Sequence, residues 1–97
     1  MNAIPKFSEQ IESIELARLT AVLIRTAQSL VELSDERDTV SEFDGRTIAM
    51  TYVGRGFESI GLFLSNAYSV ETRIRYMTDN LTRLTKIKNH ILEEMAA

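Results

Sequence analysis

The 97-residue sequence predicts an all-α protein, an antiparallel bundle of two or three long helices in a single domain, residues 1–97. Three observations predict it. Apolar residues recur every three or four positions through most of the chain, which is the spacing of one helix face. The chain divides into segments of similar length, 8–34, 40–66 and 69–95, and each would span about 40 Å as a helix. A content of 44% hydrophobic and 26% charged residues is typical of a globular domain.

The first predicted helix covers residues 8–34. Ser8 is a candidate N-cap, and acidic residues follow it, where they favour the positive end of the helix dipole. The apolar residues of this segment cover well over half of the helix circumference, whereas a helix packed on one side needs a stripe of about 100°. The inward stripe is predicted to contain Leu16, Leu19, Leu23, Ala27 and Leu30. The excess apolar surface predicts that this helix is covered on two sides.

The second cover is expected to be another copy of the chain, because exposed apolar helix faces usually mark interfaces. We therefore predict a homodimer whose helices pack lengthwise, as in a coiled coil, and which contacts a further protein partner. The residues predicted at the dimer interface lie on the inward stripe of segment 8–34 or on its flanks, and they are Leu16, Leu19, Val22, Leu23, Ile24 and Val31.

The second predicted helix covers residues 40–66. Residues 39–42 fit the capping-box pattern S/T-x-x-E that starts helices, although the Asp44-Gly45 pair could delay the regular helix. The apolar spacing of three and four continues to the end of the segment. Three glycines in it are interpreted as points where helices approach closely, because their spacing does not match a nucleotide-binding loop, and they are Gly54, Gly56 and Gly61.

The third predicted helix covers residues 69–95. Asn66 could end the preceding helix, and Ser69 could cap this one. The apolar repeat nevertheless passes through the junction almost in register, and no glycine or proline forces a turn there. One continuous helix over 40–95 is therefore the alternative, and it would require a dimer, because half of so long a helix would otherwise be uncovered.

Charge is distributed unevenly along the chain, whose formal net charge is −3. Residues 1–44 carry four basic and nine acidic residues, whereas residues 45–97 carry seven basic and five acidic ones. We interpret this as an acidic helix packing beside a basic one. The alternative function is a small DNA-binding transcriptional regulator that uses the basic helix 69–95. Its possible surface for an anionic partner contains Arg73, Arg75, Arg83, Lys86 and Lys88.

Part of this basic helix, residues 67–76, resembles the recognition helix of MerR-type regulators. Those helices carry Val-Glu-Thr followed directly by an apolar residue, an arginine and an aromatic residue. Here Arg73 stands between Thr72 and Ile74, and one inserted residue rotates the rest of a helix by about 100°. The sequence therefore identifies no family, and nucleic acid is not expected as a partner.

No catalytic, cofactor or metal site is predicted, and the protein is not expected to be an enzyme. The chain has no cysteine, and its only histidine, His90, lacks the Glu-x-x-His pattern of metal sites in helical bundles. No apolar run approaches the length of a membrane span and no signal-peptide pattern is present, so a cytoplasmic location is expected. The expected function is a non-enzymatic helical module for protein–protein interaction, as in a small adaptor, chaperone or regulator.

Overall fold

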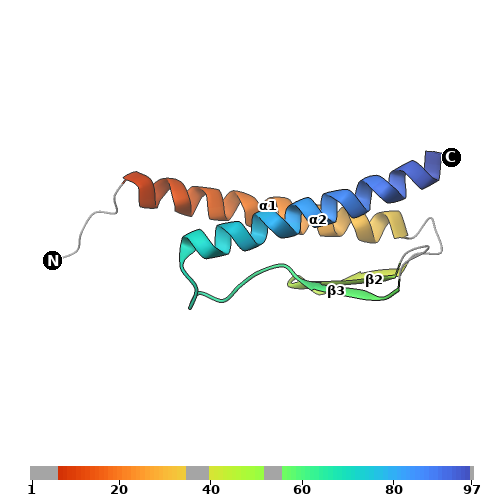
Figure 1. Cartoon of the computed structure of the whole chain (residues 1–97), viewed down its shortest axis with the longest axis horizontal. Coiled ribbons are helices and arrows are strands. Elements are labelled where there is room, and N and C mark those ends of the chain that lie inside the picture. The colour runs from red at the N-terminus through yellow and green to blue at the C-terminus, as the bar shows by residue number, and fades with distance from the viewer. Residues whose placement is uncertain (1–6, 35–39, 52–55, 97) are drawn as a thin grey trace.

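The computed structural model describes residues 7–34, 40–51 and 56–96. Along the chain, one long helix precedes a three-stranded antiparallel sheet and a second long helix follows it (Figure 1). The elements are α1 (Phe7–Ser34), β1 (Val40–Phe43), β2 (Thr47–Thr51), β3 (Glu58–Gly61) and α2 (Val70–Ala96). The predicted all-α bundle is therefore wrong. The protein has an α+β fold, in which both helices lie over the same side of the sheet (Figure 1).

The two helices lie close to the first and third predicted helical segments. The hydroxyl of Ser69 accepts the backbone N–H of Thr72 (3.2 Å), which is the N-cap geometry that starts α2 at Val70. The helices run in the same direction (Figure 1), whereas the bundle was predicted to be antiparallel. The reason is topological: three antiparallel strands between two helices reverse the chain an even number of times.

The segment predicted as the second helix, residues 40–66, contains the three strands instead. The strands follow the order β1-β2-β3, and Glu42, Ala49 and Ser59 lie in one row across them. In β2 the side chains alternate, so that Ile48 and Met50 are buried under the helices. The continuous helix over 40–95 is therefore also wrong, as is the helix start at 39–42.

The glycines of this segment do not lie in a helix. Gly61 ends β3, and Gly56 lies in the exposed stretch before β3, while Gly54 falls outside the described residues. Gly45 is the glycine with a conformational role, because its φ is 97° and no described residue other than glycine has a positive φ. A positive φ at the first central residue alone is the pattern of a type II′ hairpin turn.

Asp44 fixes this hairpin. Its Oδ1 accepts the backbone N–H groups of Thr47 (2.7 Å) and Arg46 (2.8 Å) across the turn. These two hydrogen bonds, that of Thr47 first, lower the pKa of the Asp44 carboxyl below its usual range. The ionised carboxylate therefore binds the turn more strongly than the protonated acid does.

The Asp44→Asn variant should remove part of the pH dependence of stability. The folded-state pKa of Asp44 is lowered, so its charge stabilises the fold above the unfolded pKa of an aspartate, about 3.9. That contribution is lost as the pH falls through the lower folded pKa. Urea unfolding measured from neutral to acid pH should thus show a higher free energy of unfolding for the parent protein than for Asp44→Asn, and this difference should become smaller in acid. A difference of the same size at every pH would contradict this role.

The core lies between the helices and the sheet. α1 and α2 contact each other, and α1 also contacts β1. The predicted inward stripe of α1 supplies part of this core, although Leu16 is only half-buried at its edge. The buried apolar residues among those described are Leu19, Leu23, Ala27, Leu30, Ile48, Met50, Ile60, Leu62, Met77, Leu84, Ile87 and Ile91. Neither described helix is long and apolar enough to cross a membrane.

Candidate interaction surfaces

One face of α2 is attached to the end of β3 by polar side chains. The hydroxyl of Tyr76 donates to the carbonyl of Gly61, and Asn80 Nδ2 donates to the carbonyls of Gly61 (3.1 Å) and Leu62 (3.3 Å). Leu62 N–H donates to the carbonyl of Arg46 (2.8 Å), so by the antiparallel alternation Gly61 directs its groups away from β2. The side chains of α2 therefore satisfy a carbonyl at the outer edge of β3.

The cations predicted as an anionic-partner surface are already engaged within the chain or lie apart. Arg75 forms an ion pair with Glu71 one turn earlier (3.2 Å), and Arg83 forms one with Glu58 of β3 (3.2 Å). Arg73 is half-buried, and its Nε has no hydrogen-bond partner among the described residues. Two of the five predicted cations are thus paired with carboxylates of the same chain, and a third is half-buried.

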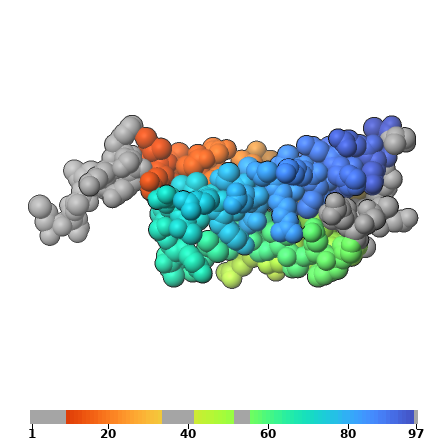
Figure 2. All heavy atoms as spheres, viewed as in Figure 1, coloured from red at the N-terminus to blue at the C-terminus, as the bar shows by residue number. Residues whose placement is uncertain are grey.

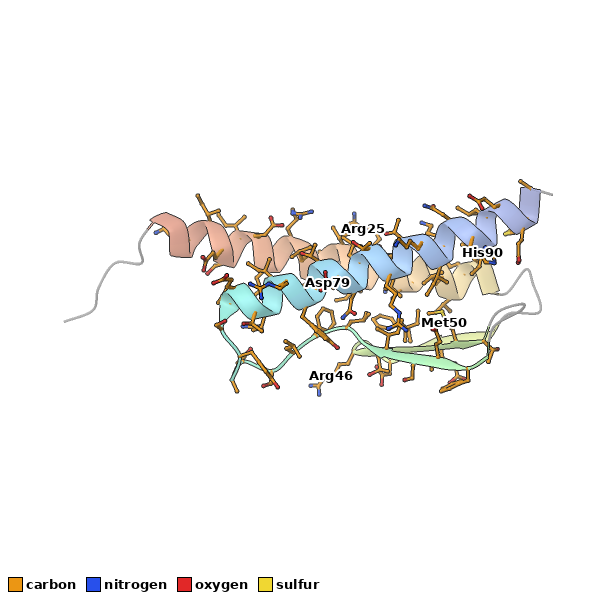
Figure 3. The ribbon with its side chains drawn as sticks, viewed as in Figure 1. Arg25, Arg46, Met50, Asp79 and His90 are labelled. Atoms are coloured by element: carbon orange, nitrogen blue, oxygen red, sulfur yellow. The ribbon has the colours of Figure 1, made fainter. Side chains whose placement is uncertain are left out.

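The other two cations do not complete a basic stripe. Lys86 is exposed, whereas Lys88 is half-buried and lines a groove between the two helices with Ser29. The remaining charges are dispersed: Arg25 on α1 points away from the sheet, and Arg46 at the hairpin points away from the helices (Figure 3). Nucleic-acid binding needs clustered cations along one face, and the described residues do not provide such a face.

The residues predicted at the dimer interface divide into two groups. Leu19 and Leu23 are fully buried in the core of the single chain, so a second copy cannot reach them in this fold. The others are half-buried, and they are Leu16, Val22, Ile24 and Val31. Part of the apolar surface of α1 is therefore buried within the single chain, in the core between the helices and the sheet. The sheet was not predicted from the sequence.

An exposed apolar surface remains on the outer side of α1, near its N-terminus. Ile14 is 69% exposed and Ile11 is 49% exposed. The exposed Ala17 and Ala21 continue the same side of the helix at spacings of three and four residues. We call these four residues the outer α1 patch. The start of α1 extends past the start of α2 (Figures 1 and 2), and all four patch residues are exposed.

An ion pair borders this patch. The guanidinium of Arg18 donates to both carboxylate oxygens of Glu15 one turn earlier, with an Nε–Oε2 distance of 3.0 Å. The hydrogen bond lowers the pKa of Glu15 and raises that of Arg18. The two opposite charges at the border of the patch therefore balance each other.

Leu19 and Leu23 were predicted at the interface from the sequence, whereas the exposed Ile14 and Ala21 were not. The sequence does contain a sign of Ile14 and Ala21, because they are apolar or small residues of the first helix that lie outside the inward stripe. Without the sheet, however, the flanks of α1 could not be separated from its outer side.

The described residues offer no metal site. No group of three or more His, Cys, Asp or Glu side chains among them could hold an ion. His90, near the end of α2, has its Nε2 3.1 Å from a carboxylate oxygen of Glu94, one turn further along the helix. Such a pair on an exposed helix surface is ordinary and points to no ligand.

Comparison of the chain with family models, with curated proteins and with solved structures returned no match.

Proposed function

We propose that this chain is a non-enzymatic protein–protein interaction module, a small adaptor, chaperone or regulator of the cytoplasm, that works as a homodimer. The outer α1 patch is the observation that carries the proposal. Large apolar side chains exposed next to each other usually mark an interface, and Ile14 and Ile11 are among the most exposed large apolar residues described.

A second copy is the occupant that suits this patch best. Two α1 helices related by a two-fold axis would place the same surface on both sides of the contact. Ala17 and Ala21 would let the helix axes approach closely, while Ile14 would fill the space beside them. Glu15 and Arg18 at the border carry opposite charges, so Glu15 of one copy could face Arg18 of the other without repulsion.

The Ile14→Arg variant should shift the equilibrium to monomers. The substitution replaces an apolar contact at the centre of the interface with a charged side chain. The loss of such a central contact typically costs about 2 kcal/mol or more, which corresponds to about a thirtyfold weaker dimer. Sedimentation equilibrium at tens of micromolar should give twice the chain mass of 11.0 kDa for the parent protein. The variant should give the mass of one chain.

The matched control is Leu92→Arg, which places the same charge at an exposed apolar position on the other helix. Leu92 is 41% exposed near the end of α2, far from the outer α1 patch (Figure 1). It should leave the dimer intact. A parent protein that is monomeric at tens of micromolar would remove the proposal, and dissociation by Leu92→Arg alone would move the interface to α2.

A further inference from the structure

The two outer edges of the sheet differ. At β3, the Gly61 carbonyl that points away from β2 accepts hydrogen bonds from Tyr76 and Asn80 of α2. At β1, no further strand pairs with the outer edge within the described residues, because the sheet order is β1-β2-β3. Open strand edges are templates for pairing with another extended chain, so the β1 edge is a candidate site for such pairing.

The direction of the β1 hydrogen-bonding groups follows from the hairpin. Asp44 N–H donates to the carbonyl of Thr47 (3.3 Å), and Glu42 lies opposite Ala49 in the same register. Hydrogen-bonded and non-hydrogen-bonded pairs alternate along an antiparallel ladder. Glu42 therefore bonds to β2, while the backbone groups of Ser41 and Phe43 point outward.

A groove of about 490 Å³ runs between this edge and α1. Its described lining consists of Phe43 from β1 and Gln28, Val31 and Glu32 from α1. Phe43 lies in the same row as Ile48, so it belongs to the sheet face that is packed against the helices. A strand added at β1 would direct every second side chain into this groove and the others to the open face of the sheet.

Charge argues against a second copy in this position. If two β1 strands paired about a two-fold axis through residue 42, Glu42 would face Glu42 of the second copy. A shift to an axis through residue 43 would bring Glu42 opposite Asp44 instead. Like charges directly opposite each other destabilise strand pairs, and charged residues on an edge strand suppress self-pairing.

The same charges favour a basic partner. Glu32 lies in the groove and Glu42 stands on the edge strand, and none of the four described residues that line the groove is a cation. A partner strand with a Lys or Arg opposite Glu42 would form a cross-strand pair of opposite charge on the open face. Its alternate apolar side chains would contact Phe43 and Val31.

We propose that the β1 edge binds an extended segment of another protein as a fourth strand, with alternating basic and apolar residues. The backbone groups of residues 41 and 43 supply the hydrogen bonds, and the groove and Glu42 supply the selectivity. This surface lies on a different element from the outer α1 patch, so it does not depend on the dimer proposed above.

Two fluorescent peptides test this proposal on the full chain. The first is acetyl-Thr-Lys-Val-Lys-Ile-Thr-amide, and the second carries Glu in place of both Lys residues. Anisotropy titrations at low salt should show the basic peptide binding at least about tenfold more tightly than the acidic one. Hydrogen exchange should show the amide of Phe43 protected only when the basic peptide is present. No binding of either peptide at millimolar concentration would overturn the proposal.

Two proline variants locate the edge. Ser41→Pro removes an N–H that points away from β2, and edge strands tolerate proline where the lost N–H faces outward. Ser59→Pro is the matched control, because by the same alternation Ser59 presents its N–H at the outer edge of β3. Binding of the basic peptide should be lost in Ser41→Pro and kept in Ser59→Pro. The reverse result would assign the site to β3.

Glu42→Lys keeps the proposal testable if a proline variant unfolds. This substitution leaves the backbone groups of β1 in place and reverses the charge on its open face, so the acidic peptide should become the preferred one. An unchanged preference for the basic peptide would contradict the role of Glu42. Peptide binding is measured on the Ile14→Arg variant as well. A result against strand addition at β1 can therefore be distinguished from a result against the proposed dimer.

Discussion

The Leu84→Ala variant is expected to lower the free energy of unfolding by about 2–5 kcal/mol, the usual range for Leu→Ala in a core. Leu84 has no exposed surface and lies on α2 among the residues buried between the helices and the sheet. Removing its side chain loses the transfer energy of the buried carbons and leaves a cavity that the neighbouring elements can fill only in part.

Urea denaturation followed by circular dichroism measures this loss directly. Leu92→Ala is the matched control, because Leu92 lies on the same helix and is 41% exposed. That variant should change the free energy of unfolding by no more than about 0.5 kcal/mol. If Leu84→Ala were as mild as the control, the packing of α2 against α1 would not be as described.

The Asn80→Leu variant is expected to cost about 1–3 kcal/mol, although leucine has the same number and branching of side-chain heavy atoms as asparagine and is more apolar. The buried Asn80 amide donates to the carbonyls of Gly61 and Leu62. Its replacement leaves the Leu62 carbonyl without this donor, and an unsatisfied buried acceptor has that cost. The C-terminal end of β3 would lose its hydrogen bonds to Asn80 of α2, so backbone hydrogen exchange should increase there first.

Tyr76→Phe provides the comparison for Asn80→Leu. Tyr76 donates only to Gly61, whose carbonyl keeps Asn80 as a partner, so the expected loss is smaller, about 0.5–1.5 kcal/mol. The double variant should lose more than the sum of the two single losses, because Gly61 is then left without either donor. Strict additivity in this cycle, measured by urea denaturation, would show that the two side chains do not share Gly61.

The helical segments could be predicted from the sequence because each is long. In α2 the apolar spacing persists over the full length from Val70 to Ala96, and Ser69 supplies a local cap. Residues that satisfy a period of 3.6 over several turns have few other structures that bury them. The same holds for α1, whose bounds lie within one residue of the predicted segment 8–34.

The sheet could not be separated from a helix by the same argument. The strands are only four or five residues long, and so short an alternation occurs by chance within a helical pattern. Phe57, Ile60 and Leu64 are spaced by three and four residues in the sequence, but Ile60 is buried in β3 whereas Phe57 is exposed. The Asp44-Gly45 pair was the local sign of a hairpin.

Local sequence patterns were therefore enough to predict the two long helices, the cap at Ser69 and the side of α1 that enters the core, because each depends on residues close together in the chain. The tertiary structure alone decided which surfaces are left over. Ile14 is exposed because the rest of the chain packs against another side of α1, the side that carries Leu19 and Leu23. Among the described residues no strand pairs with the outer edge of β1, whereas side chains of α2 reach the end of β3. Both results follow from contacts between segments far apart in the sequence, which no local pattern of apolar residues encodes.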